Sequence, residues 1–235
     1  MNNKTHIDHL GENIPELLAS DILDVGSGRG DFVISIAMRG GRAIGLEKSP
    51  TYRALTKEKA AAERLYVTVV DGVGENMPFP DESFDFVNMS EVIEHVDDPG
   101  RVLKEVYRVL RARGKAYISI PNRFGMKDPH FHLYGINWLP RFLADPFIGF
   151  FGRHKNYENT EAGIQNLAEM RYATFRGAQC LFEKHGFSTE DDRVLKLAKR
   201  LADRGWLVSG AGMIAYRLLR PWYFSTFHFI VTKRP

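Results

Sequence analysis

Two acidic residues, Asp24 and Glu47, flank a turn in which Gly26, Gly28 and Gly30 alternate with other residues. An apolar run precedes the turn and a helically spaced apolar pattern follows it, which is typical of a strand, a tight turn and a helix. Glycines let the backbone approach a ligand, and the start of a helix offers unpaired N–H groups. A carboxylate roughly 20 residues farther on suits the two hydroxyls of a ribose. The pattern therefore predicts a nucleotide-type ligand.

The charges around this turn select among such ligands. A dinucleotide fingerprint needs a third glycine at position 31, where this chain has Asp31. A carboxylate at the start of the helix would share its site with a pyrophosphate, and two anions repel each other. Asp24 adds another negative charge at the end of the first strand. These charges favour S-adenosylmethionine, which carries an ammonium and a sulfonium, over the nicotinamide dinucleotide of a dehydrogenase.

Four segments of the chain together resemble the class I S-adenosylmethionine-dependent methyltransferases, especially the branch that includes the ubiquinone/menaquinone biosynthesis methyltransferases. The resemblance covers roughly residues 20–122 and is carried by residues 23–30, 75–87, 91–99 and 118–122. It implies that S-adenosylmethionine is the cofactor. The glycines would then approach the methionine part, with Asp24 near its ammonium and Glu47 at the ribose hydroxyls.

The adenine side departs from the family pattern. The family commonly places an Asp two residues before the Glu-Asn pair that resembles Glu75-Asn76, and this chain has Val73 there. Either Asp71 substitutes for that Asp, or backbone groups of Val73 and Gly74 contact the adenine. The complete set of expected cofactor contacts is Asp24, Gly26, Ser27, Gly28, Gly30, Glu47, Lys48, Asp71, Val73, Gly74, Glu75 and Ser90.

Three histidines are candidate catalytic residues. An alcohol or phenol acceptor must lose a proton, so we expect a base near the donor methyl group. His130 and His132 lie in the stretch after the fifth expected strand, and His95 follows the fourth. Loop histidines without a catalytic role are the alternative. Asp128 with His130 and His132 would be a candidate metal site, but an H-x-H spacing is a weak signal, and we expect no metal.

Alternating apolar and helically spaced segments predict an α/β fold: a Rossmann-like, doubly wound, mostly parallel sheet with helices on both faces. The resemblance implies an antiparallel last strand. We expect one methyltransferase domain over residues 1–235. Its parts are a leading helix (1–20), a cofactor-binding half (21–121), an aromatic-rich substrate lid or insertion after strand five (122–170), and C-terminal helices and strands (171–235). Expected strands are 21–25, 42–46, 66–70, 84–89, 116–120 and 222–232, and expected helices are 31–39, 48–65, 98–113 and 173–184.

Composition agrees with one globular domain. The chain has 235 residues, 44% of them hydrophobic, and a single cysteine, Cys180, which we expect in the core. The N-terminal residues lack the apolar core of a secretory signal, and we see no membrane-spanning run. We therefore expect a cytoplasmic location, with peripheral contact at the membrane as a further expectation.

Basic residues gather at the C-terminal end. From Arg193 onward, nine Lys and Arg residues stand against one acid, Asp203, whereas the whole chain carries only +3. A solvated helix face is one reading of this segment. Contact with a phospholipid surface or a lipid substrate is a second, because aromatic residues alternate with the charges. Nucleic-acid binding is the least favoured.

These observations predict an S-adenosylmethionine-dependent methyltransferase. The aromatic insertion and the histidines favour a small-molecule, lipid-linked or glycan acceptor that is methylated at oxygen. The alternative is a non-catalytic S-adenosylmethionine-binding protein that acts through its basic tail on a partner or membrane. The sequence does not select the oligomeric state.

Overall fold

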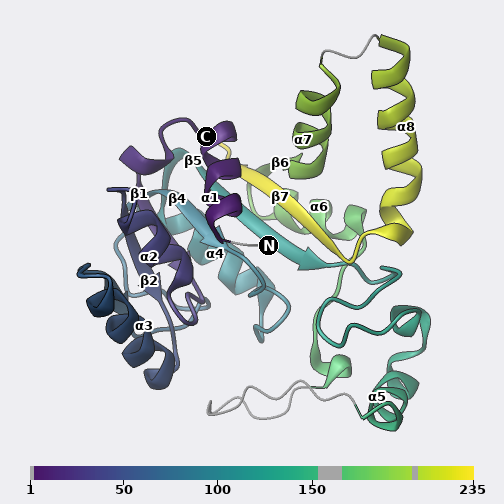
Figure 1. The fold of residues 1–235 in the computed structure, drawn as a ribbon, viewed down its shortest axis with the longest axis horizontal. Helices are drawn as coiled ribbons and strands as arrows, with labels where there is room; N and C mark the ends of the chain where they lie inside the picture. Colours follow the sequence, from purple (N-terminus) through teal and green to yellow (C-terminus); the bar gives the residue numbers. More distant parts are fainter. Residues whose placement is uncertain (1–2, 153–165, 203–205) are drawn as a thin grey trace.

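The computed structural model describes residues 3–152, 166–202 and 206–235, which form a sheet flanked by helices (Figure 1). Its seven strands have the order β3-β2-β1-β4-β5-β7-β6. All neighbours among β1 to β5 are parallel, whereas β7 is antiparallel to both β5 and β6. The predicted doubly wound sheet with an antiparallel last strand is therefore confirmed. The strands are β1 (Asp21–Val25), β2 (Arg42–Leu46), β3 (Thr68–Val70), β4 (Phe84–Met89), β5 (Leu110–Pro121), β6 (Phe187–Asp191) and β7 (Thr226–Lys233).

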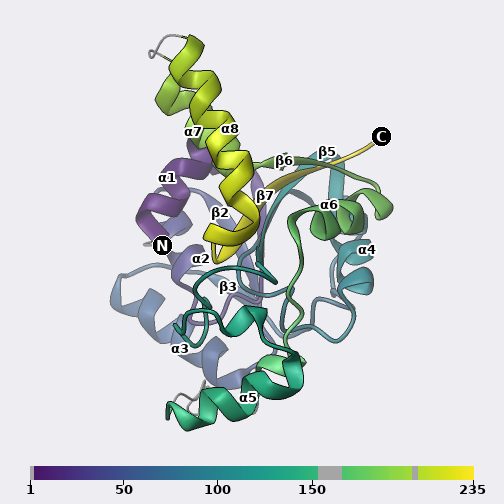
Figure 2. The ribbon, with the colours of Figure 1, turned by 90° about the vertical axis from the view of Figure 1, so that its right-hand side faces the viewer.

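Helices cover both faces of the sheet (Figure 2). On one face, Ile7 and Leu10 of α1 and Phe32 of α2 pack with Phe86 and Tyr117 of the strands. On the other face, α4 and α6 bury their apolar sides against the strands in the largest cluster of the core. The α-helices are α1 (Asn3–Asn13), α2 (Asp31–Ala37), α3 (Pro50–Ala62), α4 (Pro99–Val109), α5 (Arg141–Phe150), α6 (Phe175–Lys184), α7 (Asp192–Leu201) and α8 (Trp206–Tyr223), with short 3₁₀ turns η1 (Leu17–Ala19), η2 (Ile136–Trp138) and η3 (Leu167–Glu169).

Local signals explain where these elements begin. The Asp98 side chain accepts hydrogen bonds from the backbone N–H groups of Gly100 and Arg101, and Pro99 occupies the first turn of α4. Such a cap satisfies donors that a helix start otherwise leaves unpaired. Ser49 caps α3 in the same way through Tyr52 N. Strands β1, β2 and β4 have the bounds that the sequence predicts.

Three expectations about residues 110–235 were inaccurate. Strand β5 begins at Leu110, where we expected the preceding helix to continue, because Leu110 adopts an extended conformation and pairs with Phe84 of β4. Strand β7 begins at Thr226, since Trp222 and Tyr223 belong to the end of α8. Cys180 was expected in the core and is exposed. It follows Ala178 by two positions on α6, so it lies off the buried face.

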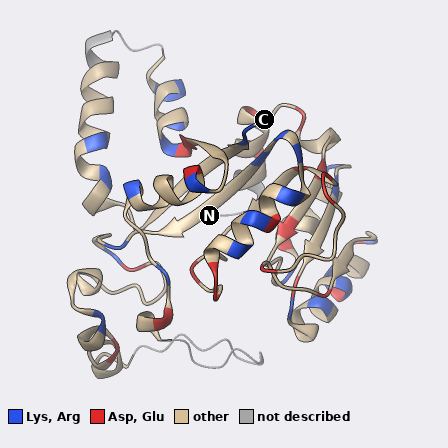
Figure 3. Ribbon diagram, turned by 180° about the vertical axis from the view of Figure 1, so that it is seen from behind, with Lys and Arg blue, Asp and Glu red and all other residues tan. Residues whose placement is uncertain are grey.

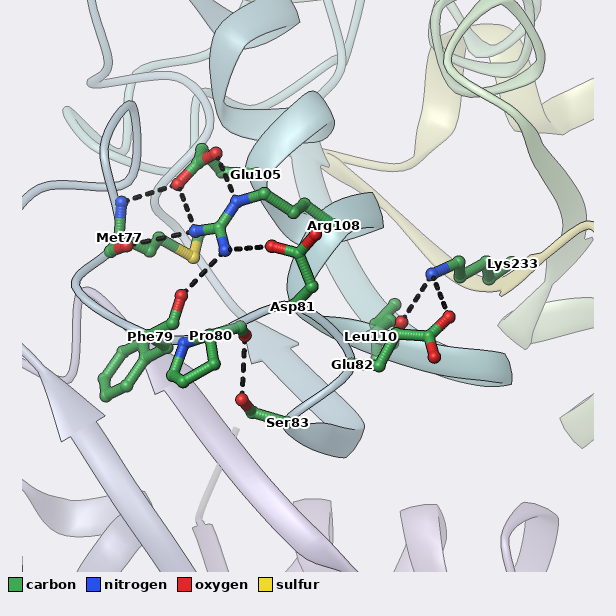
Figure 4. Close-up of polar contacts among 10 residues, drawn as sticks. All are labelled: Met77, Phe79, Pro80, Asp81, Glu82, Ser83, Glu105, Arg108, Leu110 and Lys233. Carbon is green, nitrogen blue, oxygen red and sulfur yellow. Dashed lines mark hydrogen bonds and ion pairs between the residues drawn. The ribbon is translucent and has the colours of Figure 1, made fainter.

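One arginine fixes the loop that leads into β4 (Figure 4). Arg108 of α4 donates to the carbonyl oxygens of Met77 and Phe79 and pairs with the carboxylates of Asp81 and Glu105. Glu105 in turn accepts a hydrogen bond from Met77 N. This set of charge-assisted bonds ties residues 77–81 to α4.

The end of the chain forms a helical hairpin that the sequence pattern did not predict. Helices α7 and α8 lie side by side and project beyond the sheet in both views (Figures 1 and 2). Tyr216 and Arg220 of α8 both contact Asp191 Oδ2 at the end of β6, at 2.7 and 3.1 Å. In the described part of the chain, no helix combines the length and hydropathy needed to cross a membrane.

Candidate active site

A cavity of about 960 Å³ opens at the carboxyl ends of β1, β4 and β5. This is the edge of a doubly wound sheet at which ligands bind. Two sets of elements form its wall: the β1–α2 loop and the end of β4 on one side, and the insertion, α8 and β7 on the other. The lining residues are His6, Asp24, Gly26, Ser27, Asp31, Phe32, Asn88, Ser90, Glu91, Tyr117, Ser119, Met126, Lys127, Tyr134, Arg193, Tyr223, Phe224, Ser225, Thr226 and His228.

The three glycines of the β1–α2 loop have different physical reasons for being glycine. All adopt positive φ angles, 64° at Gly26, 51° at Gly28 and 74° at Gly30. A Cβ on Gly30 would lie 2.1 Å from Thr56 Cγ2 of α3, and one on Gly26 would lie 2.7 Å from Val92 Cγ2. A Cβ on Gly28 would meet nothing nearer than the Gly26 carbonyl oxygen, at 4.0 Å. Packing thus requires Gly26 and Gly30, whereas the space beside Gly28 is open.

Glu47 holds this loop in place. The side chain is buried, with Oε2 accepting a hydrogen bond from Gly28 N at 2.8 Å and Oε1 accepting one from Ser49 N, also at 2.8 Å. An ionised carboxylate offers about four lone-pair sites, so capacity for the hydroxyls of a ribose remains. Glu47 therefore connects the glycine loop to the end of β2, and its role at the ribose stays a prediction. Glu47, Gly28 and Gly30 are not among the residues that line the cavity.

Asp24 is a buried carboxylate that accepts a hydrogen bond from the side-chain amide of Asn88 at 2.7 Å. Burial raises the pKa of Asp24 to about 7, against the hydrogen bond from Asn88, which lowers it. Nearby Glu47 raises this pKa further. A cation would stabilise the ionised form, and the ammonium of S-adenosylmethionine is such a group. The open space at Gly28 and the buried acid at Asp24 thus both fit this cofactor.

Five further residues predicted to contact the cofactor lie outside the wall of this cavity. Lys48 and Val73 are exposed, and Gly74 packs against Val102. The Asp71 carboxylate pairs with Arg53 Nη1 at 2.7 Å. Glu75 accepts a hydrogen bond from Asp97 N, which joins two loops at the strand ends. These five residues remain predicted cofactor contacts, and Asp71, Val73 and Gly74 are those predicted at the adenine. Ser90 does line the cavity, as does Ser27, whose buried hydroxyl accepts or donates no hydrogen bond among the described residues.

Glu91 carries strain at the edge of the cavity. It is an exposed non-glycine residue with a φ of 57°, and its N–H donates to Ser119 Oγ at 2.8 Å. The left-handed conformation costs about 1–2 kcal/mol. It turns the chain sharply after β4, and the residues that follow, Glu94 and His95, reach the insertion.

The structure brings together two of the three candidate catalytic histidines. The rings of His95 and His130 lie 5.2 Å apart between centroids, beside the buried carboxylate of Glu94. His132 is exposed on a turn at a φ of 59° and does not join them. Among the described residues, none of the three histidines lines the cavity itself. The catalytic assignment of these residues stays a prediction.

Sequence reasoning missed a buried polar group on the floor of the cavity. His6 Nε2 lies 3.3 Å from Asn88 Oδ1, and the Tyr117 hydroxyl lies 2.6 Å from His228 Nδ1. Burial lowers the pKa of His6 to about 4. Burial and the positive charge of Arg193 lower the pKa of His228 to about 3. A signal existed for His228, a polar residue that interrupts the apolar run of the last strand. None existed for His6, since only the packing of α1 brings it to the sheet.

The chain is similar in sequence to several methyltransferases. Residues 23–118 match the family described as Methyltransferase domain. A ubiquinone/menaquinone biosynthesis C-methyltransferase from Geotalea daltonii is 35% identical over 163 residues, covering 61% of this chain and 68% of the relative. A demethylmenaquinone methyltransferase from Listeria monocytogenes is 32% identical, covering 72% of this chain and 70% of the relative. A rice 2-methyl-6-phytyl-1,4-hydroquinone methyltransferase is 35% identical, but the match covers 34% of that protein and 55% of this chain.

Solved structures agree on the fold. An S-adenosylmethionine-dependent methyltransferase from Mesorhizobium loti superposes with a TM-score of 0.61 at 18% identity, covering 96% of each chain. Phosphoethanolamine N-methyltransferase 2 from Haemonchus contortus, in complex with S-adenosyl-L-methionine, gives 0.62 at 16% identity, covering 99% of this chain and 53% of the other. At such identities the likeness concerns the fold.

Proposed function

The chain belongs to the class I S-adenosylmethionine-dependent methyltransferases and is related to the ubiquinone/menaquinone branch. From this premise we propose that it methylates a lipid-linked aromatic acceptor of the prenylated quinol type. The observation that carries the proposal is the composition of the cavity wall opposite the glycine loop. Tyr134, Tyr223 and Phe224 lie on that side, with Met126 beside them. Aromatic and thioether side chains suit a flat, apolar ring.

The insertion contributes to this wall from the acceptor side. Met126, Lys127 and Tyr134 belong to the predicted insertion, 122–170, of which residues 153–165 lie outside the described part of the chain. They line the cavity together with Tyr223 and Phe224 from the end of α8. We propose that this segment covers the acceptor while the glycine loop and Asp24 hold the cofactor. With the sulfonium already activated, the protein must align the acceptor and exclude water, and alignment can supply about 7–11 kcal/mol.

An exposed apolar surface adjoins the acceptor side of the cavity. Large apolar residues of α8, α5 and the turn η2 between them are exposed: Trp138, Phe142, Phe147, Phe150, Phe151, Ile214, Leu218, Leu219, Trp222 and Tyr223. We call these ten residues the apolar margin. Trp138 and Trp222 connect its two parts, with ring centroids 6.5 Å apart. Both helices lie on the side of the molecule that Figure 2 turns toward the viewer.

The charges beside the apolar margin favour an anionic phospholipid surface. Helix α8 has no acidic residue, and its charged residues are Arg217 and Arg220 (Figure 3). Arg217 is exposed, as is Arg200 on α7, whereas Lys199 pairs with Glu12 and Arg220 pairs with Asp191. Exposed aromatic residues next to exposed cations are typical of peripheral membrane contact. We propose that the protein takes its acceptor from such a surface.

Methyl transfer to a prenylated quinol tests the acceptor. The protein is incubated with S-adenosylmethionine carrying a CD₃ group and with vesicles that contain demethylmenaquinol, and products are detected by mass spectrometry. We expect a labelled product, and a rate at least tenfold lower for the same ring without its prenyl chain. If cofactor binding is measurable by calorimetry but neither ring is labelled, the acceptor proposal is wrong and the non-catalytic binding protein is favoured.

NMR of the product identifies the methylated atom. Oxygen is the expectation from the sequence, and an aryl methyl ether would agree with it. The Geotalea daltonii relative is named a C-methyltransferase. A methyl group on a ring carbon would therefore correct the expectation of oxygen and leave the acceptor class unchanged.

Vesicle co-sedimentation tests the membrane surface. We expect binding to vesicles that contain phosphatidylglycerol, little binding to pure phosphatidylcholine, and loss of at least 80% of the bound fraction in the double variant Leu218→Glu/Leu219→Glu. Tyr66→Glu is the matched control, since Tyr66 is also an exposed apolar residue but lies before β3, outside the apolar margin. Equal binding by the double variant and the control would overturn the proposal.

A further inference from the structure

Three potential metal ligands meet between the loop after β4 and the loop after β5. Glu94 Oε1 lies 3.3 Å from His130 Nε2 and 3.8 Å from His95 Nε2. One ligand atom from each of the three residues can be chosen so that all lie within 4.8 Å of one another. The H-x-H spacing suggested His132 and Asp128 as partners of His130, but the fold supplies Glu94 and His95 instead.

The Glu94 carboxylate is the unusual member of this group. Its side chain is fully buried, and neither of its oxygens accepts a hydrogen bond from the described residues. Its near neighbours are the two imidazole rings. A buried carboxylate is costly unless a cation or several donors compensate it. The surroundings therefore favour a cation held jointly by the carboxylate and the two rings.

Separate hydrogen bonds hold the loops that carry these ligands. The buried Asp128 side chain accepts from His130 N at 2.8 Å and from Phe131 N at 2.7 Å through Oδ1, and from the Tyr172 hydroxyl at 2.9 Å through Oδ2. Arg171 N donates to the Glu94 carbonyl oxygen at 3.0 Å. Both loops are thus fixed to residues 171–172. None of these bonds uses the side chain of Glu94, His95 or His130, so the loops are positioned without occupying the side-chain atoms that would bind a cation.

We propose that Glu94, His95 and His130 form a binding site for one divalent transition-metal cation of the zinc type. Four-coordinate Zn²⁺ with bonds of about 2.05 Å places neighbouring ligand atoms roughly 3.3 Å apart. The observed 3.3 and 3.8 Å need only a small closure. Two imidazoles and one carboxylate are the ligand set of an open zinc site, which leaves a coordination position for water or a hydroxyl. Mg²⁺ and Ca²⁺ prefer oxygen ligands and suit this set poorly.

The site adjoins the acceptor side of the cavity. Ser90 and Glu91, on the same loop as Glu94, line the cavity, and so do Met126 and Lys127, on the same loop as His130. A bound cation would therefore join the two loops beside the place where we propose the acceptor binds. The metal-binding proposal itself does not depend on the identity of that acceptor.

Calorimetric titration of the full-length protein with Zn²⁺, after removal of metals by a chelator, tests the site. We expect one Zn²⁺ per chain with a Kd of a micromolar or below, unaffected by millimolar Mg²⁺. Co²⁺ gives an independent readout, because three protein ligands and a water should produce the visible absorption of a four-coordinate site. No saturable binding by the unmodified protein, or binding that Mg²⁺ abolishes, would overturn the proposal.

Variants locate the bound ion. Glu94→Gln keeps the shape of the side chain but removes its charge, and we expect at least a 30-fold weaker affinity for Zn²⁺ and loss of the Co²⁺ spectrum. His130→Ala should have the same effect. His132→Ala is the matched control, two residues away and exposed, and should bind as the unmodified protein does. Circular dichroism and S-adenosylmethionine binding confirm that each variant is folded, and unchanged metal affinity in a folded Glu94 or His130 variant would contradict the assignment.

Discussion

The two sides of the cavity are held by different kinds of contact. On the cofactor side, Glu47 bonds to Gly28 and Ser49, which lie 19 and 2 residues away in the chain. On the acceptor side, Asn122 donates to the carbonyl oxygens of Pro221 and Phe224, at separations of 99 and 102 residues. The bonds of Glu47 thus stay within one βαβ element, although Asp24 also reaches Asn88 of β4, whereas the bonds of Asn122 join distant segments. We expect mutations on the two sides to affect different measurements.

Gly28→Val should have the largest effect and should fall on cofactor binding. A branched side chain would occupy the open space above the loop, and we expect S-adenosylmethionine affinity to fall more than 100-fold in calorimetry. The positive φ adds a destabilisation of about 1–2 kcal/mol, small enough to leave the protein folded. Gly30→Ala is the comparison, because its Cβ would clash with Thr56 and should lower the unfolding temperature more. Micromolar binding by Gly28→Val would contradict the assignment of the loop.

Asn122→Ala should have the next largest effect, on stability. Asn122 is buried, and besides its two donated bonds its Oδ1 accepts from Phe124 N at 3.0 Å. Leaving these backbone groups unpaired should lower the free energy of unfolding by about 2–3 kcal/mol. Denaturant titration measures this change, with exposed Asn76→Ala as the control. If the variant instead lost cofactor affinity at unchanged stability, the division between the two sides would be wrong.

Glu47→Ala should weaken cofactor binding by about 1.5–3 kcal/mol, the range for charge-assisted hydrogen bonds. The loop loses its bond to Gly28 N, and the ribose loses its acceptor. Calorimetry with S-adenosylmethionine and S-adenosylhomocysteine should show the same loss for both, because both carry the ribose. Unchanged affinity would mean that the ribose is held elsewhere.

Asp24 should make cofactor binding depend on pH. Its pKa of about 7 means that the free protein protonates this acid as pH falls, whereas the ammonium of the cofactor needs the ionised form. The affinity for S-adenosylmethionine should therefore be highest above pH 7. Well below pH 7 it should fall by up to tenfold for each pH unit, which is about 1.4 kcal/mol of binding free energy. Titrations between pH 5.5 and 7.5 measure the slope. Asp24→Asn should bind more weakly with a flatter profile, and an unaltered slope would assign the dependence to another group.

The sequence by itself determined the cofactor side. The strand at residues 21–25, the glycine turn and the acids Asp24 and Glu47 lie within one stretch of chain, and short-range periodicity and capping signals decide such elements. The same reasoning identified the parallel sheet, because alternating strands and helices leave few topologies open. The antiparallel last strand came from the resemblance.

Only the tertiary structure decided the acceptor side. Glu94 and His130 are 36 positions apart, and His6 reaches Asn88 only because α1 packs on the sheet. The same apolar residues of α8 would suit a buried helix or an exposed one, and the sequence pattern alone does not distinguish them. Which distant surfaces pack together decides which residues are buried and which loops come into contact. The pKa values of the buried groups follow from that burial. The packing of distant surfaces is a property of the whole fold, and no local sequence pattern predicts it.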